Sequence, residues 1–300
     1  VPNEHHEIAL AKSLYPSLTV EAHKAWLEMV HRYFAGTLGL VVFSITFLCL
    51  KSRVVSFGLP LALSVVIVFQ ALLGMWTVTM KLMPIVVMGH LLGGFTLFCL
   101  LNVLYWKVSQ ISQPSLGLGN VSALTKTLAA TSGLLLVAQI ALGGWTSSNY
   151  AALMCTSLPI CQGNWVEYLD FQTAFQLIQP HSESYEFGTL DYGARMTIHV
   201  SHRFGALLVT FFSLALIYRL MQEGEPRLTA AAKRVALMLI IQLLLGISNV
   251  LFSLPLLIAV AHNLGAALLL VSVLQVNYLL FRRVGVVTEQ SGLQHKENVR

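Results

Sequence analysis

The stretch LGMWTVTMKLMPIVVMGH, at residues 73–90, returns later in the chain as LGISNVLFSLPLLIAVAH, at residues 245–262. Both run eighteen residues from a Leu-Gly pair to a histidine, with a proline shortly before the histidine. Upstream, HRYFAGTLGL at 31–40 matches HRFGALLVTF at 202–211. The spacing also agrees, with 59 residues from His31 to His90 and 60 from His202 to His262. Four anchors in the same order indicate two copies of one unit.

The composition places both copies in a membrane. Apolar residues make up 56% of the chain, charged residues 10%, and the mean hydropathy is +0.73, whereas a soluble domain carries roughly a quarter charged residues. Seven stretches reach the length of about 20 apolar residues that crosses a bilayer. Because helices satisfy their own backbone in lipid, we predict an all-α polytopic membrane protein. Its spans are expected near 33–50, 57–80, 82–106, 125–145, 196–220, 233–252 and 255–281.

A third correspondence predicts a further helix. The pattern Gln-x3-Gly occurs at Gln70, Gln139 and Gln242, each near the outer end of an outward-running helix. In the second copy, the helix with Gln139 leads into a long loop and then His202, whereas the first copy begins partway through the equivalent loop. We therefore expect another helix before residue 1, and a parent of two pseudo-symmetric four-helix bundles related by an axis along the membrane normal.

The expected domains follow from the repeat. Residues 1–106 form the N-terminal bundle, 107–124 a cytoplasmic linker, 125–282 the C-terminal bundle with its outer loop at 146–195, and 283–300 a cytoplasmic tail. Basic residues gather at alternate helix ends, and most of the acidic residues lie in the opposite segments. The positive-inside rule then places the N-terminus outside and the C-terminus in the cytoplasm. The net charge of +5 is thereby explained without a nucleic-acid partner.

Four histidines lie in apolar segments: His31, His90, His202 and His262. Ionisable groups in a membrane are costly and are candidates for function, although a single buried histidine can also be a packing residue. Four at duplicated positions favour metal ligation. Heme iron takes one imidazole from each face, while structural zinc needs four clustered ligands, so two histidine pairs indicate heme. Five further histidines are expected in solvent: His5, His6, His23, His181 and His295.

Small and basic residues near these histidines suit a porphyrin. Gly93, Gly205 and Gly265 each follow a candidate histidine by three residues, on the same helix face. They are expected to let the macrocycle approach the backbone; close helix packing is the alternative. Arg32 and Arg203 suit pairing with heme propionates, or they anchor the helices at the membrane interface.

The two copies differ at one position. Three residues before His31 stands Glu28, and three residues before His202 stands His199. A carboxylate one turn from a heme ligand can position water or stabilise charge that develops on a substrate, but Glu28 also suits a helix start. His199 is open to three interpretations: an alternative ligand, a donor behind the ligand, or a surface residue.

The cysteines fall into two kinds. Cys49 and Cys99 lie in apolar helices, where we expect small buried hydrophobes. Cys155 and Cys161 share the outer loop, a setting in which disulfides persist. We predict a bridge between them; two free thiols are the alternative.

Five motifs together resemble the heme A synthase family: WLEMVHRYFAGTLGL, MPIVVMGHLLGG, MCTSLPICQGNW, IHVSHRFGALL and AVAHNLGAALLL. The resemblance implies an eight-helix fold in two bundles and an enzyme that oxidises the ring D methyl group of heme O to the formyl group of heme A. It implies that His31 and His90 flank the substrate heme O, that His202 and His262 ligate heme B, and that Glu28 serves catalysis. The family's first helix is absent from this sequence.

The resemblance also implies a location and partners. The location is a bacterial inner membrane or a mitochondrial inner membrane. The partners are heme O synthase and cytochrome oxidase assembly proteins, and a homo-oligomer is left open. Without the resemblance, two other functions remain: a non-enzymatic diheme cytochrome b type electron carrier, and a heme-handling assembly factor. Glu28 discriminates weakly between them, because an electron carrier has no use for it.

Overall fold

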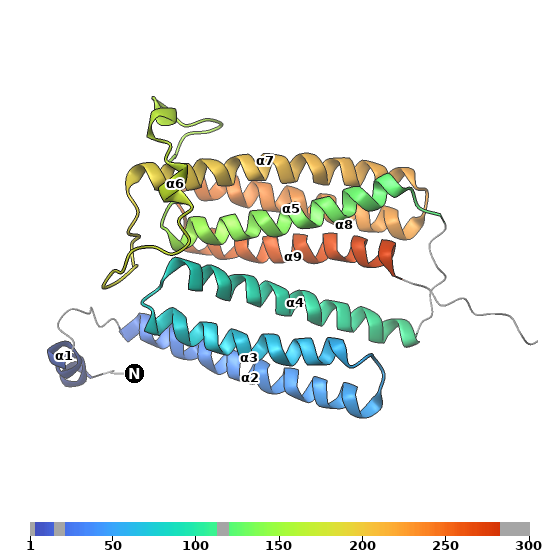
Figure 1. Cartoon of the computed structure of the whole chain (residues 1–300), viewed down its shortest axis with the longest axis horizontal. Coiled ribbons are helices and arrows are strands. Elements are labelled where there is room, and N and C mark those ends of the chain that lie inside the picture. Colours follow the sequence, from blue (N-terminus) through green and yellow to red (C-terminus); the bar gives the residue numbers. More distant parts are fainter. Residues whose placement is uncertain (1–3, 15–21, 113–119, 283–300) are drawn as a thin grey trace, which may run out of the picture.

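The computed structural model describes residues 4–14, 22–112 and 120–282 (Figure 1). Within these ranges the chain forms helices and no strand. Seven of the described helices are long and apolar enough to cross a membrane, as the sequence predicts. They are α2 (Ala22–Ser52), α3 (Gly58–Thr79), α4 (Pro84–Ser112), α5 (Ala123–Ser148), α7 (Tyr192–Gln222), α8 (Pro226–Leu251) and α9 (Leu256–Phe281). The chain is therefore an integral membrane protein.

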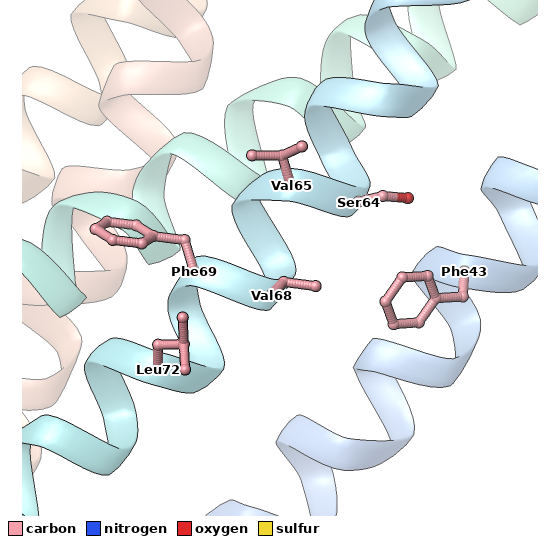
Figure 2. A pocket seen from close by; sticks show the side chains of 6 residues that line it. All are labelled: Phe43, Ser64, Val65, Val68, Phe69 and Leu72. Atoms are coloured by element: carbon pink, nitrogen blue, oxygen red, sulfur yellow. The ribbon is translucent and has the colours of Figure 1, made fainter.

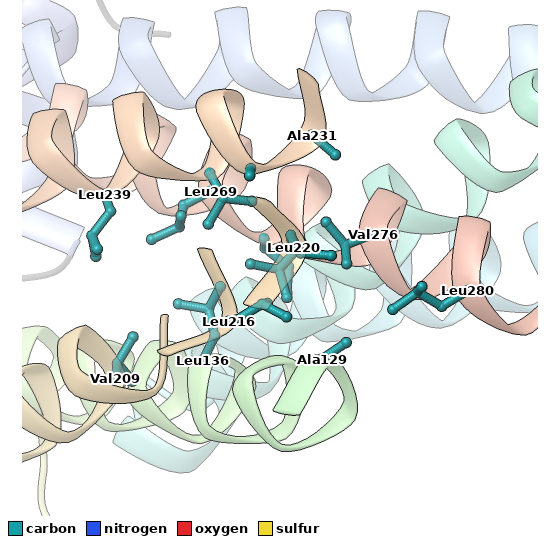
Figure 3. Close-up of a cluster of buried hydrophobic side chains, with 14 of the residues drawn as sticks. Ala129, Leu136, Val209, Leu216, Leu220, Ala231, Leu239, Leu269, Val276 and Leu280 are labelled. Carbon is teal, nitrogen blue, oxygen red and sulfur yellow. The ribbon is translucent and has the colours of Figure 1, made fainter. Parts of the chain in front are cut away.

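The C-terminal half is a closed ring of four helices. In this ring α5 contacts α7, α7 contacts α8, α8 contacts α9, and α9 returns to α5. Its centre is a cluster of aliphatic side chains, including Leu216, Leu220, Leu269 and Val276, all at most 1% exposed (Figure 3). Because lipid is as apolar as these side chains, the cluster stabilises the half through close van der Waals packing. The ring order places α7 diagonally opposite α9.

The N-terminal half repeats three sides of this ring. Helix α2 packs on α3 and α3 packs on α4, with Val42, Leu63, Leu97 and Leu104 buried among them. Helix α4 also contacts α5 and α9, and so joins the halves (Figure 1). Among the described helices, α5 has no counterpart in the first half. The arrangement is consistent with two pseudo-symmetric bundles.

Three helices end in the same left-handed turn. The residue after the cap of α3, α5 and α8 has a positive φ: 49° at Lys81, 53° at Tyr150 and 55° at Ser253. In each turn, the following amide donates to the carbonyl five residues earlier, at 2.8, 2.9 and 2.7 Å, the hydrogen bond of a Schellman motif. These are the three helices that carry Gln-x3-Gly, so the repeat extends from the sequence into the backbone.

These turns mark one end of the molecule, which we call the histidine end: here α3, α5 and α8 finish and α2, α4, α7 and α9 begin. The loop between α5 and α7 covers this end and contains η1 (Trp165–Tyr168) and α6 (Phe171–Ala174) (Figure 1). Trp145 Nε1 donates to the Ala174 carbonyl at 2.8 Å. The Tyr185 amide donates to the Lys81 carbonyl of the α3–α4 turn at 3.1 Å. The loop of the second half therefore also holds the first half.

Several helices are longer than the sequence predicts. Helices α2 and α7 begin at Ala22 and Tyr192, and α4 continues to Ser112. The spans expected near 33–50 and 196–220 begin earlier than predicted, so His31 and His202 are the tenth and eleventh residues of their helices. At a rise of 1.5 Å per residue they lie roughly 14 Å along the helix axis. A short helix that was not predicted, α1 (His5–Leu14), precedes the spans and buries no side chain.

A hollow of about 420 Å³ lies between α2 and α3 (Figure 2). Five apolar side chains and Ser64 line it: Phe43, Val65, Val68, Phe69 and Leu72. None of the four candidate histidines borders it. The hollow therefore lies apart from the candidate site.

Candidate heme site

The first histidine pair comes together between α2 and α4. The ring centres of His31 and His90 are 6.4 Å apart, with the ring planes at 80°. Two imidazoles that share one metal through bonds of about 2 Å have ring centres about 6 Å apart. The spacing therefore fits a shared iron. His31 is exposed, while Nδ1 of His90 is buried without a hydrogen-bond partner.

The second pair comes from the diagonal of the closed ring. His202 lies on α7 and His262 on α9, the two helices that stand opposite each other in the ring. His262 is the seventh residue of α9, as His90 is of α4. The structure thus places one pair in each half, all four near the histidine end.

Three of these histidines each face a glutamine side chain. Gln70 Nε2 donates to the His90 carbonyl at 2.8 Å, and Gln139 Nε2 donates to the His202 carbonyl at 2.8 Å. Gln242 Nε2 lies 3.3 Å from the ring nitrogens of His262. Each glutamine precedes its histidine along the chain and lies on the adjacent helix, so a tight helix pair brings the two together.

The glycines after these histidines have a different role from the expected one. A Cβ added at Gly93, Gly205 or Gly265 would collide with the oxygen of Gln70, Gln139 or Gln242 respectively. The recess that each glycine leaves is therefore filled by an amide from the neighbouring helix. These three glycines therefore do not leave space for a macrocycle. They allow close packing of neighbouring helices, which was the alternative interpretation.

Arg203 binds the outer loop. Its Nη1 donates to the Ser157 carbonyl at 2.8 Å, and its Nη2 donates to the Cys155 carbonyl. Cys155 and Cys161 form the predicted disulfide, with Cα atoms 5.4 Å apart. Nε of Arg203 is buried and has no partner, so its N–H remains for a further acceptor such as a propionate. The arginine next to His202 therefore connects the ligand helix to the disulfide loop.

Arg32 has a different partner from Arg203. Its Nη2 donates to Glu28 Oε1 in an ion pair between residues four apart on α2. Glu28 and Arg32 keep 45% and 55% of their side-chain surface exposed. Their ion pair holds the carboxylate on the stretch of helix that carries His31. Pairing of either arginine with a heme propionate stays a prediction.

His199 is a buried residue, which removes one of its three interpretations. It is 5% exposed, and its Nδ1 lies 2.9 Å from the Ala151 carbonyl at the end of α5. Nε2 of His199 is buried without a partner. His199 is therefore not a surface residue, and one of its nitrogens fastens α7 to the loop.

The described residues fit heme better than a closed metal site. No group of three or more His, Cys, Asp or Glu side chains gathers as metal ligands in the described part of the chain. Zinc in a structural site takes four such ligands, whereas heme iron takes two axial ones. The 6.4 Å spacing of His31 and His90 and the unpaired Nδ1 of His90 are consistent with the second arrangement.

The fold and the site define a polytopic helical membrane protein with a histidine pair at one end of each half. The family model described as cytochrome oxidase assembly protein, COX15-CtaA, matches residues 1–274. The chain belongs to this family, as the resemblance predicts. It is 51% identical over 285 residues to the heme A synthase of Shewanella oneidensis, covering 94% of this chain and 84% of that protein.

More distant relatives carry the same name. The heme A synthase of Nitrosospira multiformis is 26% identical over 293 residues, 93% of this chain and 79% of the relative. That of Neorickettsia sennetsu is 26% identical over 248 residues, 81% and 71% respectively. The similarity therefore extends over both halves of the chain.

The threefold Gln-x3-Gly pattern is the sequence signal for these glutamines. On its own the pattern locates equivalent helix ends and does not indicate a role for the side chains. Their contact with the histidines depends on the lateral packing of neighbouring helices, which the spacing along one helix does not determine.

Proposed function

We propose that this chain is a heme A synthase, which oxidises the methyl group on ring D of heme O to a formyl group and so makes heme A for cytochrome oxidase. The similarity to proteins of that name supports the proposal over most of the chain. The observation that carries it is the His31–His90 pair, with ring centres 6.4 Å apart, in which His31 is exposed and His90 is partly buried. A substrate heme needs such a pair, with axial ligands and an accessible side.

In this proposal the halves divide the work. His31 and His90 hold heme O, and His202 and His262 hold heme B. Bound heme supplies the redox chemistry, and the protein supplies ligands, orientation and charge. The C-terminal half supports the cofactor role, because its ring of helices is closed and the disulfide loop covers its end.

Glu28 acts at the substrate half. It stands one helical turn before His31, on the same face, and Arg32 orients its carboxylate. A carboxylate at this place can position a water molecule or stabilise positive charge that develops on the reacting carbon. The matching position of the second half holds His199, which is engaged with Ala151. The second half therefore serves electron transfer.

The proposed setting follows from the same reasoning. The protein lies in a bacterial inner membrane or its mitochondrial equivalent, with the histidine end outside. It receives heme O from heme O synthase, and its product passes to proteins that assemble cytochrome oxidase.

Co-expression tests the proposal. The full-length gene is expressed with heme O synthase in a host that makes no heme A, and the extracted hemes are separated by chromatography. We expect heme A only when both genes are present. Folded, heme-loaded protein that yields heme O and heme B but no heme A would support the electron-carrier alternative and exclude the enzyme.

A further inference from the structure

Three glutamines face three of the candidate ligands through the same arrangement. Gln70, Gln139 and Gln242 come from α3, α5 and α8, and they face histidines of α4, α7 and α9. Gln139 makes two contacts, with the His202 carbonyl at 2.8 Å and with His202 Nδ1 at 3.1 Å. Each glutamine amide therefore reaches the backbone of its histidine, the imidazole ring, or both.

Two glycines make room for each contact. The glycine three residues after the histidine leaves the recess that holds the glutamine oxygen. The glycine four residues after the glutamine faces the imidazole. A Cβ at Gly74, Gly143 or Gly246 would lie 3.3, 3.1 or 3.2 Å from Cε1 of His90, His202 or His262 respectively. A side chain at either glycine would thus press on the amide or on the ring.

Each glutamine amide has an oxygen that accepts no hydrogen bond. Oε1 of all three glutamines is buried without a partner, and so is Nδ1 of His90. Unpaired buried polar atoms are costly, and their occurrence at three equivalent places points to a shared use. Metal-ligating histidines almost always donate the N–H of the ring nitrogen that does not bind the metal to a second group. In each glutamine, Oε1 is the atom able to accept such a bond.

We infer that Gln70, Gln139 and Gln242 are positioning residues for the heme ligands His90, His202 and His262. Each amide fixes the turn and the ring plane of its histidine, and the paired glycines keep the amide and ring in contact. The inference rests on the proposed heme binding and not on the oxidation itself. His31 lacks this arrangement in the described part of the chain, since the residue three positions after it is Phe34 and not a glycine.

The test compares glutamine variants in the full-length, heme-loaded protein. Gln→Met keeps the length of the side chain and removes the amide. We expect Gln139→Met and Gln242→Met to shift the low-spin EPR g values and the midpoint potential of the heme in the C-terminal half. Gln70→Met should shift only the heme of the N-terminal half. Because each variant has an internal control in the other half, a general loss of stability does not reproduce this pattern.

A glycine series tests the same contact from the other side. Gly205→Ala drives a Cβ into the Gln139 amide and should reproduce the spectroscopic shift of Gln139→Met. Gly133→Ala, on the same helix as Gln139, is the matched control, because its Cβ would have Asn277 Nδ2 at 3.5 Å and Val273 Cγ1 at 3.8 Å as nearest atoms. It should leave both signals unchanged.

The outcomes separate the two proposals. Unaltered g values and potentials in heme-loaded Gln139→Met and Gly205→Ala would overturn the positioning role. If Gln139→Met does not fold, Gly205→Ala still carries the test, and unaltered signals in that variant overturn the role. Wild-type protein that binds heme and shows the expected shifts, yet makes no heme A, would sustain the positioning role and refute the enzyme. Wild-type protein without heme would refute both.

Discussion

At the scale of single residues, Glu28 and His199 occupy matching positions in the two halves but have different surroundings. Glu28 is exposed and paired with Arg32, whereas His199 is buried and bonded to the loop. The position one turn before a ligand is thus open to solvent or substrate in one half and closed in the other. The repeat supplied two similar sites, and this difference allows them separate tasks.

Replacing Glu28 tests the task of the first site. We expect Glu28→Gln to retain both hemes and to lower heme A yield at least about tenfold, because removing a general acid–base or charge-stabilising group costs about 10²–10⁴ in rate. The measurement is chromatography of extracted hemes, with the Soret absorbance as a check on loading. Arg32→Gln is the control for the ion pair alone. Equal heme A yield from Glu28→Gln and wild type would remove the assigned role.

Arg203 provides a second prediction at this scale. Arg203→Lys keeps the charge but loses the planar fork that reaches the Cys155 and Ser157 carbonyls. Since hydrogen bonds to charged groups contribute about 1.5–3 kcal/mol, the melting temperature should fall and heme should leave the C-terminal half faster. Thermal melts followed at the Soret band would measure both. An Arg203→Lys variant with the melting temperature of the wild type would show that the contact of Arg203 with the loop does not stabilise the protein.

At the scale of helices and loops, seven spans could be predicted because apolar runs of this length are distinctive. Their starts could not, because the first turns of α2 and α7 are polar and continue into the covered histidine end. The structure of the loop also escaped prediction. Its short helices are held by particular hydrogen bonds, such as that from Trp145 to Ala174. The periodicity of apolar residues in the sequence does not predict such bonds.

The disulfide should stabilise this loop. It closes a segment with five intervening residues, for which the chain-entropy model gives about 2 kcal/mol. A Cys155→Ser/Cys161→Ser double variant should therefore melt at lower temperature and be cleaved by protease within 149–191. Mass spectrometry of cleavage products gives the site. Cleavage confined to other segments would contradict a stabilising role here.

Asp170 makes the fold of the loop depend on pH. Its side chain caps α6 by accepting from Thr173 N at 3.0 Å, and hydrogen bonds from Thr173 hold the pKa of the carboxyl below its ordinary value of 3.8. A lowered pKa means that the cap stabilises the loop above that value and is lost as the pH falls through the lowered pKa.

Thermal melts test this dependence. We expect Asp170→Ala to lower the melting temperature at pH 7 and to have a smaller effect near pH 3. A difference between the variant and the wild type that stays constant over this range would mean that the charge of Asp170 does not matter.

At the scale of the whole molecule, the charge distribution predicts an orientation. Basic residues such as Arg53, Lys107, Arg219 and Arg282 lie at the helix ends opposite the histidine end, and the positive-inside rule places that side in the cytoplasm. A fluorescent protein fused after the C-terminal tail, residues 283–300, should fold and fluoresce. The tail itself lies outside the described residues. A dark fusion, together with external labelling of the tail, would reverse the orientation.

Heme ligation could be predicted from the repeat, and the ring spacing of His31 and His90 agrees with it. The role expected of Gly93, Gly205 and Gly265 was wrong. The glycines follow the histidines in sequence, but a glutamine from another helix fills the space that they leave. Sequence spacing identifies residues on one face of a helix. It does not show which residue of a neighbouring helix packs against that face.

Helix α4 has a consequence for communication between the two proposed heme sites. It carries His90 of the first pair and leans on α9, which carries His262 of the second, and on α5, which carries Gln139. If both halves hold heme as proposed, a tilt of α4 when a whole heme enters or leaves the first half would reach His262 and Gln139 through these contacts. The change of one amide beside His90 would not tilt the helix, so only occupancy of the first half should register in the spectrum of the second.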